Sequence, residues 1–207
     1  MSRAYAELAF TPDVQAMQTR QGSRKAYARM AADDAAPSAP LSEAEAEFIG
    51  ARDGFYQSSV SQTGWPYVQF RGGPTGFLKV LDAHTLGYAD LRGNKQYISA
   101  GNLQGNDRVA LILMDYAHRR RLKLMGRVRF VDAKDDPALM ARLVMPSVKT
   151  PAERAVVIDV AAFEWNCPQH ITPRFTEAEI GVAVAPLHEE IARLKTELAQ
   201  ARAAKSQ

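Results

Sequence analysis

Short strand-like segments that follow one another closely are the feature that most constrains how this chain can fold. Between residues 55 and 131, segments rich in Val, Ile, Leu, Phe and Tyr alternate with turn residues, as at Thr63–Gly64 and near Asp82–His84. Closely spaced segments of this kind are typical of antiparallel strands. No long crossover helix separates them, which argues against a parallel sheet. We therefore predict a mainly β fold, an antiparallel barrel with peripheral helices.

Two later segments carry the pattern of long strands. From 120 to 130, apolar residues alternate with basic ones, and residues 154–165 form a last apolar strand. One face of the first segment holds Leu122, Leu124, Gly126, Val128 and Phe130, and the other holds Arg121, Lys123, Met125, Arg127 and Arg129. Successive side chains of a strand point to opposite faces. Much of the basic charge in this region is therefore expected along one side of one strand.

The flanking segments divide the chain into three parts. Residues 1–40 are interpreted as a helical extension, with Pro12 at a first helical position, that ends in a linker over 31–40. Residues 41–180 form the main domain, with helices predicted over 43–52 and 137–145. Residues 181–207 are a helix whose apolar positions are Leu187, Ile191, Leu194 and Leu198. That spacing matches two heptads, so both a short coiled coil and a packed surface helix remain open.

Composition excludes several classes of protein. The single cysteine rules out an internal disulfide and a multi-cysteine zinc site, and the four histidines are scattered without metal-ligand spacing. No apolar run is long enough to span a bilayer, and the N-terminus lacks a signal-peptide core, so a cytoplasmic location without membrane contact is expected. The net charge is only +3, and no nucleic-acid-binding motif is present, so no nucleic-acid partner is expected.

Two loops could bind a small anionic ligand. Asn94, Lys95 and Gln96 stand just before a predicted helix, and a helix N-terminus with a nearby lysine favours phosphate. In 70–77, Gly72–Gly73 could let a flat ligand approach the backbone, with Arg71 beside it. The alternatives are an ordinary polar turn and a wide turn between strands.

Residues 165–175, WNCPQHITPRF, gather most of the rare side chains of the chain at the end of the last strand. Cys167 and His170 are three apart in a turn, which does not bring their side chains into contact, and no nucleophile elbow is present. Because free cysteine is commonly buried, Cys167 is interpreted as a packing residue. The segment is either a clamp for a cofactor or substrate, or a plain strand exit.

Four stretches together resemble the FMN-binding split-barrel proteins of the pyridoxamine 5'-phosphate oxidase-related group. They are GWPYVQFRGGPTGFLKVLD, LGYADLRGNKQYISAGNL, the strands from Arg108 to Arg129, and WNCPQHITPRF. They occur in the same order as in the family and cover about residues 40–180. The resemblance implies an antiparallel split barrel and a homodimer with two FMN molecules at its interface.

The resemblance also implies a set of cofactor residues. Lys95 would meet the FMN phosphate, helped by Asn94 and Gln96, although family members often carry Arg-Lys where this chain has Asn94–Lys95. The other residues that would contact FMN in one chain are Gln69, Arg71, Lys79, Val80, Leu81, Ala89 and Asp90. Those that would reach it from the partner chain are Arg121, Lys123, Trp165, Asn166 and Gln169.

The resemblance also implies which residues face the substrate beside the flavin. His170 and Arg174 would face the substrate as tentative catalytic residues, and the imidazole of His170 could move a proton near neutral pH. Pyridoxamine phosphate oxidases end in an R-x-H-type segment, whereas this chain has PQHITPR, which puts oxidation of pyridoxamine phosphate in question.

The leading hypothesis is an FMN-dependent oxidoreductase that acts with an unidentified small-molecule substrate or electron donor. A flavin-binding carrier without turnover, or a split barrel that holds heme or a deazaflavin, remain as alternatives.

Overall fold

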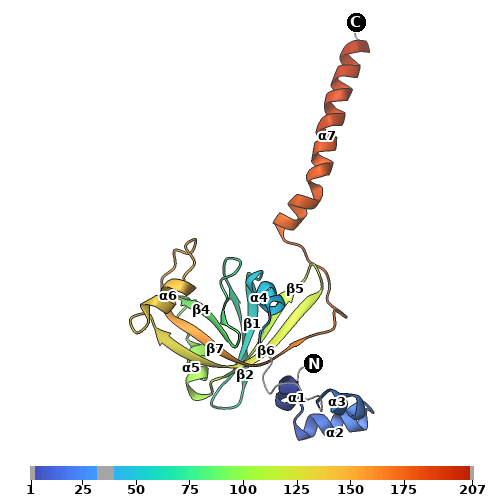
Figure 1. Ribbon diagram of the computed structural model, residues 1–207. Coiled ribbons are helices and arrows are strands. Elements are labelled where there is room, and N and C mark those ends of the chain that lie inside the picture. The colour runs from blue at the N-terminus through green and yellow to red at the C-terminus, as the bar shows by residue number, and fades with distance from the viewer. Residues whose placement is uncertain (1–2, 32–39, 206–207) are drawn as a thin grey trace.

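Seven antiparallel strands form one sheet at the centre of the computed structural model, which describes residues 3–31 and 40–205 (Figure 1). The strands are β1 (Gly54–Val60), β2 (Pro66–Gly72), β3 (Lys79–Asp82), β4 (Thr85–Leu91), β5 (Arg108–Asp115), β6 (Arg120–Asp132) and β7 (Ala152–Trp165). The predicted hairpins are present, because β1 pairs with β2 and β3 pairs with β4. The mainly β, antiparallel prediction is confirmed.

The sheet curls until its two ends face each other. The strand order is β2-β1-β5-β6-β7-β4-β3, so β2 and the β3–β4 hairpin lie at opposite ends of the hydrogen-bonded ladder. Side chains nevertheless bridge these ends: Arg71 of β2 contacts Asp90 of β4 at 2.9 Å, and the Tyr88 hydroxyl donates to Gln57 of β1 at 2.9 Å. The barrel is therefore closed by side chains where the backbone ladder is missing, and we call this seam the split.

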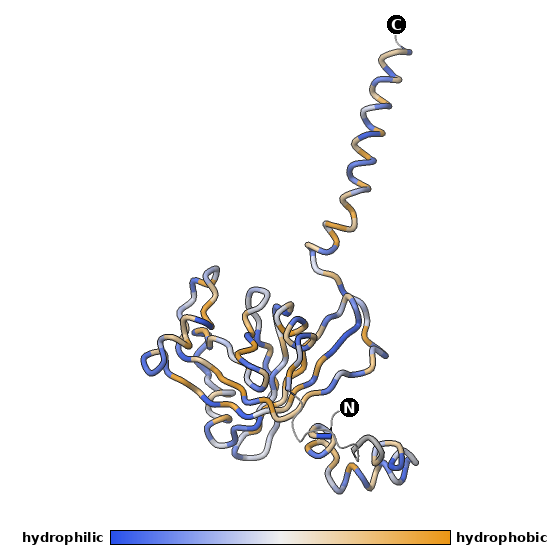
Figure 2. Tube along the Cα trace, viewed as in Figure 1, coloured by the Kyte–Doolittle hydropathy of each residue, from blue (hydrophilic) through white to orange (hydrophobic). Residues whose placement is uncertain are grey.

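The alternation predicted for the long basic strand is confirmed. Leu122, Leu124 and Val128 of β6 are buried in the main core, while the basic residues between them, Lys123 and Arg127, are at least partly exposed. A bulge interrupts the β6–β7 pairing at Met125/Gly126. A side chain at Gly126 would place its Cβ 2.6 Å from the Asp159 carbonyl oxygen, so only glycine fits there. Figure 2 shows hydrophobic residues gathered where the strands cross and hydrophilic ones in the loops.

Three short helices surround the barrel: α4 (Glu43–Gly50), α5 (Ile98–Gly105) and α6 (Pro137–Leu143). A capping box formed by Ser42 and Glu45 starts α4, and Asp136 caps α6 by accepting from the Leu139 amide at 2.8 Å. The helix predicted over 43–52 ends two residues early. The chain turns at Ala51 because it must enter β1 at Gly54.

The N-terminal extension is helical where it is described. It contains α1 (Arg3–Ala9), α2 (Pro12–Arg20) and α3 (Arg24–Ala31). Helix α1 packs on β7 through the buried residues Ala4 and Ala6. The linker predicted over 31–40 falls almost entirely outside the described residues.

Helix α7 (Glu177–Lys205) extends away from the barrel, and the N-terminal helices lie on the other side of the molecule (Figure 1). The sequence predicted a helix over 181–207, but the helix begins four residues earlier, at Glu177, and Pro186 lies inside it. None of its residues is buried. Within the described part of the chain, no helix is long and apolar enough to cross a membrane.

Candidate cofactor site at the split

A buried ion cluster closes the split. Asp90 of β4 is 6% exposed and is bound on both sides by arginines. Nη1 of Arg71 donates to Oδ1 of Asp90 at 2.9 Å, and Nε of Arg154, from β7, lies 3.3 Å from Oδ2. Nε of Arg71 is buried and has no hydrogen-bond partner among the described residues. A buried guanidinium N–H without a partner is costly, which makes this atom a candidate for contact with a bound anion.

The turn before α5 has unusual backbone geometry. Lys95 and Tyr97 adopt left-handed conformations, with φ of 61° and 52°, a region that non-glycine residues rarely occupy. The side-chain oxygen of Asn94 accepts from the Gln96 amide at 3.1 Å and holds the turn. Strained backbone of this kind clusters at functional sites. The turn that the sequence predicted before a helix is therefore present, and the helix, α5, begins at Ile98. The backbone conformation of this turn makes it a candidate ligand site.

The start of α5 leaves amide donors available. The first helical hydrogen bond runs from the Gly101 amide to the Tyr97 carbonyl at 2.8 Å. The amides of Ile98, Ser99 and Ala100 come before that bond and have no helical carbonyl to pair with. Tyr97, at the N-cap position, makes no side-chain capping bond. This end of α5 therefore carries free donors and a positive dipole end.

A polar cavity lies between this turn and the barrel. Six of the predicted residues line it: Gln69, Arg71, Asp90, Asn94, Lys95 and Gln96. Sequence reasoning missed Tyr67, Tyr97, Ser99 and Glu153, which also line it. The buried Ser99 hydroxyl donates to Oε1 of Gln69 at 2.7 Å, so it joins the helix start to β2. Tyr67 and Glu153 lie on β2 and β7, so no local sequence signal places them there, whereas Tyr97 and Ser99 follow Gln96 so closely that the predicted turn could have included them.

Glu153 is the second carboxylate at this cavity, and it is heavily hydrogen-bonded. The Tyr97 hydroxyl donates to it at 3.1 Å, and Arg92 and Arg154 each lie 3.3 Å from it. Desolvation raises the pKa of Glu153, but these hydrogen bonds outweigh it and the net shift is downward. The same hydrogen bond raises the pKa of the Tyr97 phenol. Glu153 is thus an ionised anchor for Tyr97 and the arginines.

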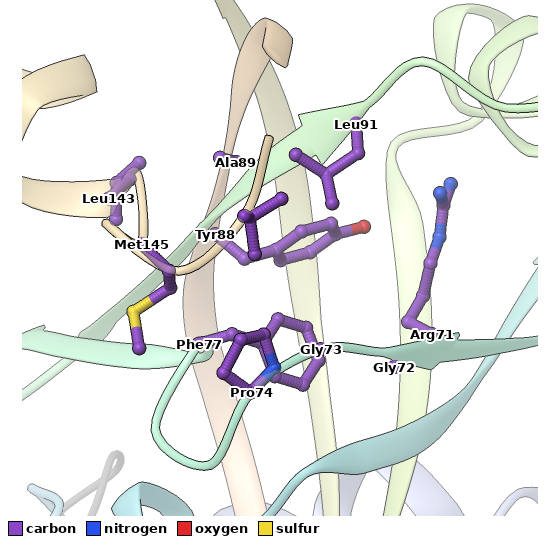
Figure 3. A pocket seen from close by; sticks show the side chains of 11 residues that line it. Arg71, Gly72, Gly73, Pro74, Phe77, Tyr88, Ala89, Leu91, Leu143 and Met145 are labelled. Atoms are coloured by element: carbon purple, nitrogen blue, oxygen red, sulfur yellow. The ribbon is translucent and has the colours of Figure 1, made fainter. Parts of the chain in front are cut away.

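A second, mostly apolar cavity adjoins the first at Arg71 (Figure 3). Figure 3 shows the rings of Phe77 and Tyr88 beside Leu91, with Met145 and Leu143 at the far side and Arg71 as the one charged side chain in the view. Predicted residue Ala89 also lines this cavity. The pair of cavities therefore offers a cationic, amide-rich pocket next to an apolar one.

The glycines of 72–73 line the apolar cavity beside Arg71. A Cβ on Gly72 would lie 2.8 Å from the Phe70 ring, and one on Gly73 would lie 2.8 Å from the Phe77 ring. Both glycines therefore also make room for aromatic rings of the protein itself. The approach of a flat ligand to their backbone stays a prediction.

The predicted residues of β3 adjoin the site without lining either cavity. Val80 packs against the main core, and Leu81 packs in a small cluster with Met140 and Leu143 of α6. Lys79 pairs with Gly87 of β4. Their assignment to the cofactor stays a prediction.

The cofactor and substrate residues predicted at the end of the last strand and just after it, within 165–174, lie apart from both cavities. Trp165 packs within its own chain: Nε1 donates to Glu45 at 2.6 Å, the ring meets Phe48 edge-on at 4.7 Å, and the Arg120 guanidinium lies 4.7 Å from the ring. Nearby, Nε of Arg121 and Oδ1 of Asn166 are buried without partners among the described residues.

The segment after Trp165 is largely exposed. Gln169 and His170 are exposed, and His170 has a left-handed φ of 63°. The Arg174 guanidinium lies 4.9 Å from the centre of the Tyr116 ring. Cys167 is exposed, so its interpretation as a packing residue is wrong: it follows the end of β7, and among residues 167–175 only Ile171 is buried.

An exposed apolar row crosses the outer face of the sheet. Phe70 is paired with Tyr56, Tyr56 with Ile112 and Ile112 with Lys123, across β2, β1, β5 and β6. Phe70, Tyr56 and Ile112 are all exposed. We call these four residues the outer row. Predicted residue Lys123 therefore belongs to an apolar surface.

A family model described as pyridoxamine 5'-phosphate oxidase matches residues 41–166, which hold all seven strands, both cavities and the ion cluster. The chain belongs to this family. The matched region ends at Asn166, before Gln169, His170 and Arg174.

Solved structures also match much of the chain at low sequence identity. HupZ of Group A Streptococcus is 11% identical over 65% of this chain and 99% of its own, with a TM-score of 0.46. General Stress Protein 26 of Bacillus anthracis is 15% identical over 63% and 92%, with a TM-score of 0.44. An FMN-binding protein of Syntrophomonas wolfei is 11% identical over 72% and 97%, with a TM-score of 0.43. A comparison with curated proteins gives no match.

Among the described residues, no group of three or more His, Cys, Asp or Glu side chains could hold a metal ion.

Proposed function

We propose that this member of the pyridoxamine 5'-phosphate oxidase family is an FMN-dependent oxidoreductase whose cofactor phosphate binds at the Lys95 turn. The observation that carries the proposal is the turn itself: two left-handed residues, the free amides of α5 and the Lys95 ammonium meet beside a buried, unpartnered Arg71 N–H. A dianionic phosphate satisfies donors of this kind.

The charges around the polar cavity fit an anion. Four cations, Arg71, Arg92, Lys95 and Arg154, stand at the cavity or contact its lining, against two carboxylates, Asp90 and Glu153. That leaves an excess of two positive charges, which matches the two negative charges of a phosphate monoester. The adjoining apolar cavity suits an uncharged part of the ligand.

The chemistry would come from the flavin, which accepts a hydride or single electrons and passes them on. The role of this chain is to hold the phosphate, to offer an apolar wall through Tyr88 and Leu91, and to keep Arg71 in place through Asp90. His170 and Arg174 would stand on the substrate side as first expected.

A homodimer would supply the remaining residues. The outer row is apolar and exposed, and Arg121 and Asn166 near its edge have buried polar atoms without partners. Exposed apolar patches mark interaction sites. A second copy seated on this face would cover the row and bring its own C-terminal segment to the first copy. The cytoplasmic location expected from the sequence stays a prediction.

The absorption spectrum of the freshly purified protein tests the cofactor. We expect flavin bands near about 375 and 450 nm, with the released cofactor identified as FMN. A heme spectrum, or a deazaflavin recovered from the protein, would refute FMN as the cofactor.

Lys95→Ala tests the phosphate site. We expect FMN to bind about tenfold or more weakly, because a charge-assisted contact to the phosphate is lost. Lys134→Ala, at an exposed turn after β6, is the matched control and should bind as the wild type does. Equal affinity of the two variants would rule out this phosphate site. Reduction of the bound flavin by NADH or NADPH, followed by reoxidation with an acceptor, separates an enzyme from a carrier.

A further inference from the structure

Helix α7 presents an apolar surface that no described residue of its own chain covers. It has 29 residues, none of them buried, and it extends away from the barrel (Figure 1). Its leucines and isoleucines at 187, 191, 194 and 198 are between 48% and 61% exposed. Figure 2 shows hydrophobic and hydrophilic residues alternating along it. A solitary helix with so much exposed apolar surface is expected to have a partner.

The heptad pattern of α7 extends beyond the four positions 187, 191, 194 and 198. Its apolar positions alternate at spacings of four and three through Ile180, Val184, Leu187, Ile191, Leu194, Leu198 and Ala201. In heptad notation, the a positions are Val184, Ile191 and Leu198, and the d positions are Ile180, Leu187, Leu194 and Ala201. Pro186 falls at a c position, away from this seam. The pattern therefore spans three heptads of one continuous helix.

The residue types at the seam indicate how many helices pair. The a positions include the β-branched residues Val184 and Ile191, and the d positions include Leu187 and Leu194. β-Branched residues at a with leucine at d favour a parallel coiled coil of two helices. Neither the a nor the d positions carry a charged residue.

The charged residues that flank the seam indicate that the partner is an identical helix and that the two helices run parallel. Glu190 and Glu197 occupy g positions, and Lys195 and Arg202 occupy the e positions five residues later. In a parallel pair of identical helices, each g residue faces the e residue of the next heptad on the other helix. Glu190 then meets Lys195 of the second copy, and Glu197 meets Arg202. An antiparallel pair would instead place glutamate against glutamate.

The glutamates are already held at the edge of the seam. Arg193 bonds Glu190 at 2.5 and 2.9 Å and Glu197 at 2.7 Å within the helix. A carboxylate can accept several hydrogen bonds, so these contacts leave capacity for a cation from a second helix.

From these observations we propose that α7 pairs with α7 of a second copy of this chain as a parallel two-stranded coiled coil. This proposal uses a different surface from the outer row and does not depend on flavin binding.

Disulfide trapping in the full chain tests the seam and its direction. In a Cys167→Ser background, Ala201→Cys places a thiol at a d position, where two parallel helices bring identical residues together. Ala203→Cys, two residues later at an f position, is the matched control. We expect a disulfide-linked dimer from Ala201→Cys at a yield at least about tenfold above the control, because a d position faces its counterpart across the seam, whereas two f positions lie too far apart for a disulfide. Equal yields, or none from Ala201→Cys, would overturn the proposal.

Charge reversal tests the pairing of identical chains. In the Ala201→Cys, Cys167→Ser background, Glu190→Lys with Glu197→Lys makes both edges of the seam basic, and Lys195→Glu with Arg202→Glu makes both acidic. We expect each double variant alone to cross-link about tenfold less than its parent, and an equimolar mixture to recover the yield as a heterodimer. Cross-linking that ignores these charges would contradict the assigned register. A folded barrel in every variant, checked by circular dichroism, keeps the result interpretable.

Discussion

Replacing Asp90 with asparagine should expose how much the ion cluster contributes to closing the split. The carboxylate is buried and lies between Arg71 and Arg154, whose side chains are 19% and 20% exposed. Asparagine keeps the shape but has one acceptor oxygen, so its amide group would face one of the guanidiniums donor to donor. Removing one partner of a buried pair costs about 3–5 kcal/mol. Because both arginines are partly exposed, we expect the lower end, about 3 kcal/mol.

That loss is large enough to measure by thermal unfolding. For a chain of this size, 1 kcal/mol corresponds to about 2–4 °C, so Asp90→Asn should lower the melting temperature by about 6–12 °C. The matched control is Asp107→Asn, which removes the carboxylate of a 2.7 Å pair with Arg127 whose side chains are 44% and 61% exposed. An exposed pair contributes about 1 kcal/mol or less, so the control should shift by no more than about 4 °C.

The same variant links the cluster to the proposed anion site. With Asp90 neutralised, two guanidiniums beside the cavity lack their counter-charge, so inorganic phosphate should raise the melting temperature of the variant more than that of the wild type. A melting temperature for Asp90→Asn equal to that of Asp107→Asn would refute the view that this cluster holds the split together.

Two further predictions concern stability. Gly126→Ala should destabilise the barrel by about 2–3 kcal/mol in chemical denaturation, because the new Cβ would lie 2.6 Å from the Asp159 carbonyl oxygen. The control is Gly181→Ala on α7, where the new Cβ would meet no atom within 4 Å, and it should leave the stability of the barrel unchanged. Glu45→Gln tests pH dependence: burial raises the pKa of Glu45, but hydrogen bonds, including that of Trp165, outweigh it and lower the pKa. The stabilisation that Glu45 gives is therefore complete above its unfolded pKa of about 4.3 and is lost as pH falls through the lower folded value. The variant should be less stable than the wild type at pH 7, and the gap should close towards about pH 3.

Local patterns were sufficient to predict the elements of this fold. The alternation of Leu122 and Leu124 with basic residues predicts β6, and Asp136 followed by proline predicts the start of α6. The predicted bounds of the elements are less exact. Helix α7 begins at Glu177, four residues before the predicted start at 181, because its apolar spacing continues back through Val184 to Ile180, beyond the four positions on which the prediction was based.

The candidate site was predicted in part for the same reason. Asn94, Lys95 and Gln96 are adjacent in sequence and precede a helix, so the turn could be recognised. Glu153 reaches the same cavity, and Arg154 reaches Asp90 in its wall, only because β7 pairs with β4, which places Arg154 opposite Asp90. No spacing in the sequence encodes that contact. The cost of a buried carboxylate suggests that Asp90 has partners, but it does not say which arginines they are.

The ion cluster serves the fold and the proposed site at once, and this has a thermodynamic consequence. Arg71 lines both cavities and also bridges β2 to β4, so any anion that contacts its free N–H acts on the group that closes the barrel. A ligand that binds only the closed barrel stabilises it by RT ln(1 + [L]/Kd). Cofactor loss should therefore loosen the split before it affects the main core, because the core strands keep their full backbone ladder while β2 and β4 do not pair with each other. Faster amide exchange in β2 and β4 than in β6 on removal of FMN is the expected sign of this coupling, and uniform exchange across all three strands would show that the two roles of Arg71 are independent.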